Sequence, residues 1–379
     1  MTLPPITTMI PLADPGAAYR AHRDALDEAL GRALDSGWYI LGKEGEAFER
    51  EFAAWLGLPR AVGCANGTDA LVLILRGLGI GPGMAVATVS HTAVATVAAI
   101  EMVGATPVLI DIDPDTYTMD ADELLAVLQD PPPGLPPLRA VIAVHLYGQP
   151  CDLDPMLAAC AEAGIPLIED CAQAHGATLG GRKLGTLGVA AAFSLYPTKN
   201  LGALGDAGVL ATADEALASR IAAIRQYGWT SRYISDMAGV NSRLDELQAA
   251  VLRVRLPLLE AGNARRQHIA SCYDAALADT AIVSPMRRAG ATHVFHQYVV
   301  RHPERDSLMA LLKEQGIGSG IHYPVPVHLQ PAYLDRVALG PAGCVETEAA
   351  SREILSLPMF PELTDEQVDR VCGVLRALA

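Results

Sequence analysis

Between residues 84 and 212, short apolar runs rich in β-forming residues alternate with helix-like segments, and this alternation constrains the fold most strongly. A strand, a helical crossover and a second strand of this kind pair in parallel, with helices over the sheet. We therefore expect an α/β fold with a mostly parallel sheet, whose ligands bind beyond the carboxyl ends of the strands. The predicted strands are Met84–Val89, Thr106–Asp111, Arg139–Leu146, Pro166–Asp170, Ala190–Leu195 and Gly208–Thr212.

The length of the chain predicts more than one domain. Its 379 residues, 51% of them hydrophobic, can bury a large core and are too many for one small domain. Helical periodicity through Leu244–Leu259 leads into Asn263–Leu277, which we expect to bridge to a C-terminal domain. That domain should contain a strand over His293–Arg301, a helix near Arg305–Gln315 and a final amphipathic helix from Asp365.

Charge and cysteine content exclude several classes of protein. A formal charge of −15 argues against a nucleic-acid partner, and no polybasic patch indicates membrane binding. The seven cysteines form no Cys-x-x-Cys pair, which is typical of reduced thiols in the cytosol. Prolines interrupt the first 14 residues where a signal peptide needs an apolar core, and no run of about 18 apolar residues occurs. We expect a soluble, cytoplasmic protein.

Lys199 is the strongest candidate for chemistry. It follows an apolar strand-like run and lies five residues after Ser194, in a glycine-rich loop that ends at Gly202. A lysine held in a site loses part of its preference for the ammonium form, so a useful fraction is free amine that can form a Schiff base with an aldehyde. An ordinary loop lysine fits the local pattern equally well.

Asp170 ends another buried strand, in the segment Glu169–Gly176. Pyridoxal phosphate acts as an electron sink only while its ring nitrogen is protonated, and a buried Asp facing that nitrogen keeps it so. Gln173, three residues later, would point the same way. The alternative is that Asp170 only caps the following helix.

Two further segments could hold parts of such a cofactor. Gly67 and Thr68 follow Asn66 at a helix start, where free N–H groups and the helix dipole favour a phosphate. His91 follows a strand and could stack on a planar ring. Each segment also has a structural interpretation, since many helices begin with such a cap and a single histidine is more often a core or surface residue.

Other apparent signals carry no site. The glycine-rich stretch Gly202–Gly208 lacks the spacing and the preceding strand of a dinucleotide site, and no Walker loop is visible. His293 and His296 would lie on opposite faces of a strand, without a cluster of cysteines or carboxylates in metal-ligand spacing. We expect no metal.

Seven motifs resemble, in the same order, the DegT/StrS-type family of nucleotide-sugar aminotransferases, which have the fold-type I architecture of aspartate aminotransferase. The resemblance implies a large domain over residues 1–260, with a central, mostly parallel sheet of the seven-stranded type, and a smaller α+β domain over residues 261–379. The motifs are Asn66–Leu71, Gly104–Val108, Val144–Pro150, Glu169–Gly176, Tyr196–Asn200, Asn241–Ala249 and Gly320–Pro324.

The resemblance also implies roles for individual residues around pyridoxal 5′-phosphate. Lys199 matches the catalytic lysine that binds the cofactor as a Schiff base, and Asp170 matches the partner of the ring nitrogen. An Asn at the position of Asn241 reaches the cofactor phosphate of the neighbouring subunit in this family, which implies a homodimer with shared sites. The remaining matches are Gln173 near the ring hydroxyl, His91 at the ring-stacking position, Gly67, Thr68 and Ser194 at the phosphate, and His322 and Tyr323 near the substrate.

The reaction implied is a transamination in two half-reactions. L-Glutamate donates the amino group, and a keto-sugar linked to a nucleotide accepts it. The stretch Val144–Pro150 and the Ser90-His91-Thr92 start favour C3 of a dTDP-3-keto-6-deoxyhexose. The alternatives are a C4 aminotransferase of a dTDP-, UDP- or GDP-4-keto-sugar, a cyclitol aminotransferase, and a non-catalytic regulatory protein that binds pyridoxal phosphate.

Overall fold

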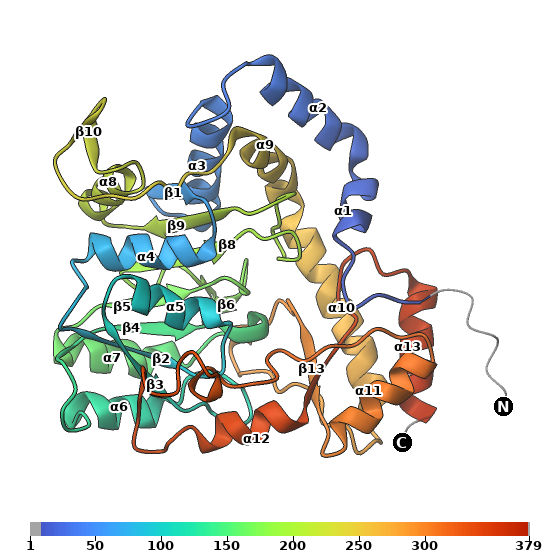
Figure 1. The fold of residues 1–379 in the computed structure, drawn as a ribbon. Coiled ribbons are helices and arrows are strands. Elements are labelled where there is room, and N and C mark those ends of the chain that lie inside the picture. The colour runs from blue at the N-terminus through green and yellow to red at the C-terminus, as the bar shows by residue number, and fades with distance from the viewer. Residues whose placement is uncertain (1–8, 378–379) are drawn as a thin grey trace.

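An eight-stranded sheet forms the centre of the computed structural model, which describes residues 9–377 (Figure 1). Its strand order is β1-β9-β8-β5-β4-β2-β3-β14. Neighbours from β8 to β14 pair in parallel, and only β9 runs against both of its neighbours. The strands are β1 (Arg60–Cys64), β2 (Ala85–Val89), β3 (Thr106–Ile110), β4 (Leu138–Val144), β5 (Leu167–Asp170), β8 (Ala190–Ser194), β9 (Gly208–Thr212) and β14 (Ala338–Leu339).

The prediction of a mostly parallel sheet is therefore confirmed, and each predicted strand is present. The strand expected over Arg139–Leu146 ends at Val144, because Leu146–Gly148 form a short 3-10 turn (η1) in which Tyr147 adopts a left-handed φ of 60°. Two strands of this sheet were not predicted: β1, and β14, a two-residue addition that extends a seven-stranded sheet at its edge.

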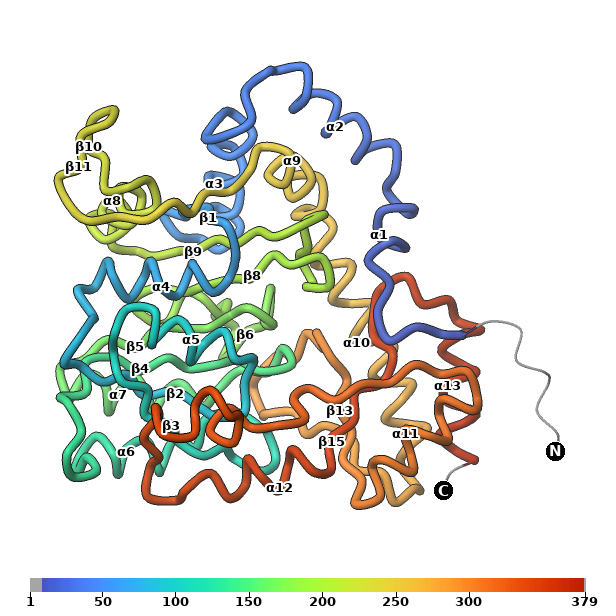
Figure 2. The backbone as a smooth tube through the Cα atoms, in the orientation of Figure 1, coloured from blue at the N-terminus to red at the C-terminus, as the bar shows by residue number. Residues whose placement is uncertain are grey.

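Helices surround the sheet and continue into the C-terminal part. Helices α2 and α3 both pack against α9 at one end of the molecule, and the long α10 runs from there to α13 (Figures 1 and 2). The helices are α1 (Pro15–Ala21), α2 (Arg23–Asp35), α3 (Lys43–Leu56), α4 (Gly67–Gly77), α5 (Val94–Met102), α6 (Ala121–Gln129), α7 (Leu153–Ala163), α8 (Glu215–Ile224), α9 (Glu246–Arg255), α10 (Leu259–Leu277), α11 (Arg305–Glu314), α12 (Val345–Glu353) and α13 (Asp365–Ala377).

Short elements complete the structure. A hairpin of β10 (Trp229–Ser231) and β11 (Ile234–Ser235) projects beyond α8 (Figure 2). The strand predicted over His293–Arg301 is shorter, because Phe295 adopts a left-handed φ of 44° and only β13 (Tyr298–Arg301) forms, paired with β15 (Ile354–Leu357). The others are β6 (Thr178–Leu179), β7 (Arg182–Lys183), β12 (Ala291–Thr292), η2 (Leu256–Leu258) and η3 (Val327–Leu329).

Two main apolar cores underlie these layers. The larger lies on both faces of the sheet, and the second gathers residues from Ile269 onward together with Ile10. The predicted domain boundary after residue 260 lies at the start of α10. It stays a prediction, because Ile10 contributes to the second core and β14 extends the main sheet. Within residues 9–377, we find no helix with the length and apolarity needed to span a membrane.

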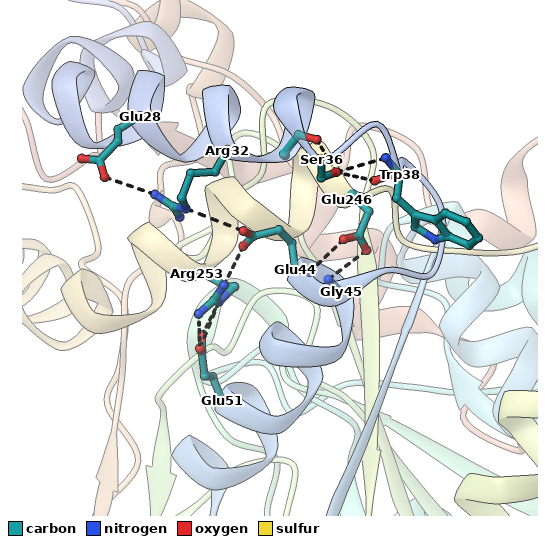
Figure 3. Close-up of polar contacts among 10 residues, drawn as sticks. Glu28, Arg32, Ser36, Trp38, Glu44, Gly45, Glu51, Glu246 and Arg253 are labelled. Carbon is teal, nitrogen blue, oxygen red and sulfur yellow. Dashed lines mark hydrogen bonds and ion pairs between the residues drawn. The ribbon is translucent and has the colours of Figure 1, made fainter.

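Glu246 at the start of α9 determines where α3 begins. Its buried carboxylate accepts hydrogen bonds of 2.8–2.9 Å from the backbone N–H groups of Gly42, Glu44 and Gly45. Figure 3 shows Glu246 beside Glu44 and Gly45. These groups lie at or near the N-terminus of α3, where they lack partners within the helix and the dipole favours a negative charge. A Cβ atom at Gly45 would lie 2.7 Å from the carboxylate, so this contact requires glycine. The contact anchors the chain just after Asn241.

Candidate active site

A cavity of about 590 Å³ opens at the carboxyl ends of the parallel strands. The segments that follow β1, β2, β4, β5 and β8 all contribute to its wall, in agreement with the expected position of a ligand site. Eight of the predicted site residues line this cavity: Gly67, Thr68, Asp170, Gln173, Ser194, Lys199, His322 and Tyr323.

Lys199 lies in the turn after β8. Its backbone N–H donates to the Tyr196 carbonyl at 2.8 Å, and the loop folds back so closely that a Cβ atom on Gly202 would lie 2.6 Å from the Pro197 carbonyl oxygen. Burial lowers the pKa of Lys199 to about 8, although the charge of Asp170 acts to raise it. At pH 7 about a tenth of the amine is therefore free, far more than for an ordinary lysine with a pKa near 10.4.

Asp170 ends β5 and is held in one orientation. Its Oδ2 accepts a 2.9 Å hydrogen bond from the Thr96 hydroxyl, and its Oδ1 accepts one of 3.1 Å from the Ala172 N–H. Burial raises the pKa of Asp170, and these two bonds and the charge of Lys199 oppose that shift. Each oxygen keeps a lone pair, so the carboxylate can also accept a hydrogen bond from a protonated ring nitrogen.

The start of α4 forms a cradle for an anion. The Asn66 side chain caps the helix by accepting from the Asp69 N–H at 2.8 Å, which leaves the first N–H groups of the helix without partners inside it. Gly67 packs directly on Ser194, where an added Cβ would lie 2.7 Å from the Ser194 Cβ. The Lys199 amine, the Asp170 carboxylate and the start of α4 all line one cavity. These groups fit the aldehyde, the ring nitrogen and the phosphate of pyridoxal phosphate.

Gln173 lies between the sheet and the C-terminal part of the chain. Its Oε1 accepts from the Tyr147 N–H at 2.7 Å, and its Nε2 donates to the Tyr323 hydroxyl at 3.0 Å. His322 also lines the cavity, and burial lowers its pKa to about 4, so the ring is neutral at physiological pH. The two residues predicted near the substrate thus face the same cavity as Lys199.

Two predicted residues do not line the cavity. His91 is buried, with its Nε2 2.9 Å from the Tyr147 hydroxyl, and this segment instead presents Thr92, Ala93, Ala95 and Thr96 to the cavity. The geometry therefore gives no support for stacking of His91 on the cofactor. Asn241 is exposed, away from the cavity of its own chain.

Sequence analysis did not find several residues of the cavity wall. Thr96 lies in the apolar helix α5, where no pattern distinguishes it as a site residue. His296 was set aside as a strand residue, yet it lines the cavity with its Nδ1 3.3 Å from the Asn200 Oδ1. Gln297 and Asp206 also line the wall. These residues come from distant segments, and no local motif marks them.

Among the described residues, His145, Glu169 and Cys171 have candidate ligand atoms within 4.8 Å of one another. The Glu169 carboxylate, however, already accepts three backbone N–H bonds of 2.7–2.8 Å from the turn 185–188 and lies 3.3 Å from His145 Nε2. His145 Nδ1 also has a partner, the Cys151 N–H at 3.1 Å. Hydrogen bonding accounts for these groups. The expected lack of a metal stays a prediction.

The lowered pKa of Lys199 predicts its reactivity in the chain without cofactor. Labelling of Lys199 by acetic anhydride should increase about tenfold per pH unit up to pH 8 and then level off, because only the free amine reacts. Peptide mass spectrometry would measure the extent of Lys199 labelling at each pH. In the unfolded chain the same lysine should not level off until about pH 10.4, the ordinary lysine value. A folded-chain profile that rises to pH 10 would contradict the assignment.

Comparison with known proteins shows similarity along nearly the whole chain. The profile of the DegT/DnrJ/EryC1/StrS aminotransferase family matches residues 21–376. The chain is 43% identical over 375 residues to the dTDP-3-amino-3,4,6-trideoxy-alpha-D-glucose transaminase of Streptomyces venezuelae, covering 98% of this chain and 97% of that protein.

Two solved structures are similar in fold as well. The crystal structure of S. venezuelae DesV, in complex with a ketimine intermediate, has a TM-score of 0.93 and 43% identity, with 98% of each chain covered. NtdA from Bacillus subtilis, solved with bound cofactor PMP, has a TM-score of 0.88 and 27% identity, covering 100% of this chain and 86% of that one.

Proposed function

The chain belongs to the DegT/DnrJ/EryC1/StrS aminotransferase family, and from this premise we propose that it transfers an amino group from L-glutamate to C3 of a dTDP-linked 3-keto-6-deoxyhexose. Its activity is that of a sugar-nucleotide aminotransferase with pyridoxal phosphate as cofactor. One observation carries the assignment of the site: Lys199, Asp170 and the start of α4 border a single cavity.

The residues of the cavity have separate tasks. When bound, pyridoxal phosphate supplies an aldehyde that holds amines covalently and a ring that withdraws electrons from the reacting carbon. The Lys199 amine would bind that aldehyde carbon and later carry the proton of the donor's Cα. Asp170 would keep the proton on the ring nitrogen. The N–H groups of Gly67 and Thr68, together with the Ser194 hydroxyl, would bind the phosphate.

The sugar position and the nucleotide are the finer part of this proposal. The dTDP-3-amino-sugar transaminase of S. venezuelae supports C3 amination and a dTDP carrier. The rivals remain a C4 aminotransferase, a UDP- or GDP-sugar enzyme, a cyclitol aminotransferase and a non-catalytic regulator.

The cysteines bear on where the protein works. All seven cysteines are free thiols, which supports a reducing, cytoplasmic compartment.

Product analysis tests the function. The holoenzyme is incubated with L-glutamate and a panel of 3-keto and 4-keto sugars on dTDP, UDP and GDP, followed by mass spectrometry and NMR of the amino sugar. We expect a 3-amino product from the dTDP-3-keto-6-deoxyhexose. A 4-amino product would overturn the C3 assignment, and no product with any acceptor, although glutamate reacts, would overturn the sugar-nucleotide acceptor.

We also propose a homodimer whose two sites are shared. Large apolar side chains are exposed between α2 and α3, with exposed fractions of 64% for Trp38, 49% for Tyr39 and 37% for Ile40. Tyr196, three residues before Lys199, is 51% exposed. A second copy of the chain that covers these side chains would remove apolar surface from water. Asn241 is exposed and available to the site of that second copy.

Complementation between two inactive chains tests the shared site. Lys199→Ala and Asn241→Asp homodimers should both be impaired, because the second variant sets a carboxylate against the cofactor phosphate. A mixed dimer has one site with an intact Lys199 from one chain and an intact Asn241 from the other. Mixing the two variants should therefore restore part of the activity. Absence of recovery, with chain exchange shown by native mass spectrometry, would count against sharing, as would a fully active monomer.

A further inference from the structure

We propose that Tyr147, which lies outside the cavity wall, is a positioning residue that holds the Gln173 and Tyr323 side chains in the orientation required by the keto-sugar. The inference rests on the proposed function for the identity of the substrate. It concerns a closed circuit of hydrogen bonds that connects segments far apart in the sequence.

The circuit passes twice through Tyr147. The Tyr147 hydroxyl donates to the His322 carbonyl, and the Tyr147 backbone N–H donates to Gln173 Oε1 at 2.7 Å. Gln173 Nε2 donates to the Tyr323 hydroxyl at 3.0 Å. Since His322 and Tyr323 are consecutive, the chain itself closes the loop. Tyr147, in the turn after β4, thereby orients both Gln173, which follows β5, and the C-terminal segment that contains His322 and Tyr323.

The His322 carbonyl determines the direction of these bonds and thereby the tautomer of His91. The Tyr147 hydroxyl has one proton, and the His322 carbonyl can only accept, so that proton lies between them. The His91 Nε2, 2.9 Å from the same hydroxyl, must then be the donor. Burial lowers the pKa of His91 to about 4, so the ring is neutral and its proton lies on Nε2. His91 thus donates a hydrogen bond to Tyr147.

The backbone of Tyr147 determines the orientation of the Gln173 amide. Tyr147 adopts a left-handed φ of 60°, and its N–H faces the Gln173 side chain. The atom that meets this N–H must be the amide oxygen, so the amide nitrogen faces Tyr323. A buried, left-handed tyrosine is an uncommon conformation, and it persists here because both ends of the residue are bonded.

The consequence for the cavity is a free proton on Tyr323. Its hydroxyl accepts from Gln173, which leaves its own proton for an acceptor in the cavity, such as an oxygen of the sugar. Burial raises the pKa of Tyr323 to about 12, so this proton is retained at physiological pH. Loss of the Tyr147 hydroxyl would release the His322 carbonyl and with it the position of this donor.

The test compares Tyr147→Phe with Tyr117→Phe in the holoenzyme. Tyr117 is buried in the same aromatic cluster, with its ring 5.9 Å from that of Tyr147, but it has no part in the circuit. In Tyr147→Phe we expect the KM for the keto-sugar to rise about tenfold, as for loss of one hydrogen bond. The KM for glutamate, and the visible spectrum of the bound cofactor, should match those of Tyr117→Phe.

A double variant distinguishes positioning from a structural role. If Tyr147 acts through Tyr323, then Tyr147→Phe should add less than about twofold to the effect of Tyr323→Phe. Additive effects, an unchanged keto-sugar KM, or equal rises in both KM values would overturn the proposal. Hydrogen exchange of the 320–325 backbone, faster only in Tyr147→Phe, gives a readout without turnover. If wild type aminates no keto-sugar, the proposed function fails, and unchanged exchange would still refute the circuit.

Discussion

Lys199→Ala is expected to abolish transamination while the fold and reversible binding of the cofactor are kept. The amine both attaches the cofactor and moves the proton, and a positioned proton-transfer group alone contributes about 10²–10⁴-fold. We expect a loss of at least roughly 10³-fold in kcat, measured as amino-sugar formation. Lys183→Ala is the matched control, because its amine bonds the Trp55 carbonyl and does not line the cavity; its activity should stay within about twofold of wild type.

Borohydride treatment of wild type gives the complementary observation. Reduction should fix the cofactor on the peptide that contains Lys199 and should remove the visible absorbance. Attachment to any other lysine would overturn the assignment of the site. Retention of substantial turnover by Lys199→Ala would show that another group moves the proton.

Asp170→Asn should slow both half-reactions by a factor of about 150 to 5,000, from the roughly 3–5 kcal/mol lost when one partner of a buried charged pair is removed. Asparagine has the same shape as aspartate but cannot hold the proton on the ring nitrogen. The ring then withdraws fewer electrons from the reacting carbon. Single-turnover spectroscopy with glutamate, and separately with the keto-sugar, would measure each half-reaction.

Thr96→Val provides a graded comparison. It removes the 2.9 Å bond to Asp170 Oδ2 but keeps the carboxylate, so its effect should be near tenfold, far below that of Asp170→Asn. Similar effects of the two variants would mean that the fixed position of Asp170 matters more than its charge. Near-normal rates in Asp170→Asn would mean that another group protonates the ring.

The sheet was predictable because its signals are local. Each predicted strand is an apolar run bounded by polar or glycine-rich residues, and the parallel strands place their carboxyl ends at one edge. Asp170 ends one predicted strand and Lys199 lies in the loop after another, so their meeting in one cavity follows from sequence order. β1 was missed because Arg60 and Gly63 interrupt the apolar pattern of its five residues.

The rest of the site depends on contacts between segments that no local pattern links. Thr96 and His296 reach the cavity only because α5 and the segment before β13 pack against β5 and the Lys199 loop. His91 follows a strand as predicted, but it does not line the cavity, and its ring lies 2.9 Å from the Tyr147 hydroxyl, in a turn 56 residues away.

The sequence by itself determined the class of fold, the family and the groups that carry the chemistry, because strand alternation and the residues that follow strands are encoded within a few positions of one another. The tertiary structure alone decided the direction of each polar side chain. Which hydrogen bonds form depends on the donor that a distant segment brings within about 3 Å. Tyr147 shows this: only the folded chain connects it to Gln173 and to His322.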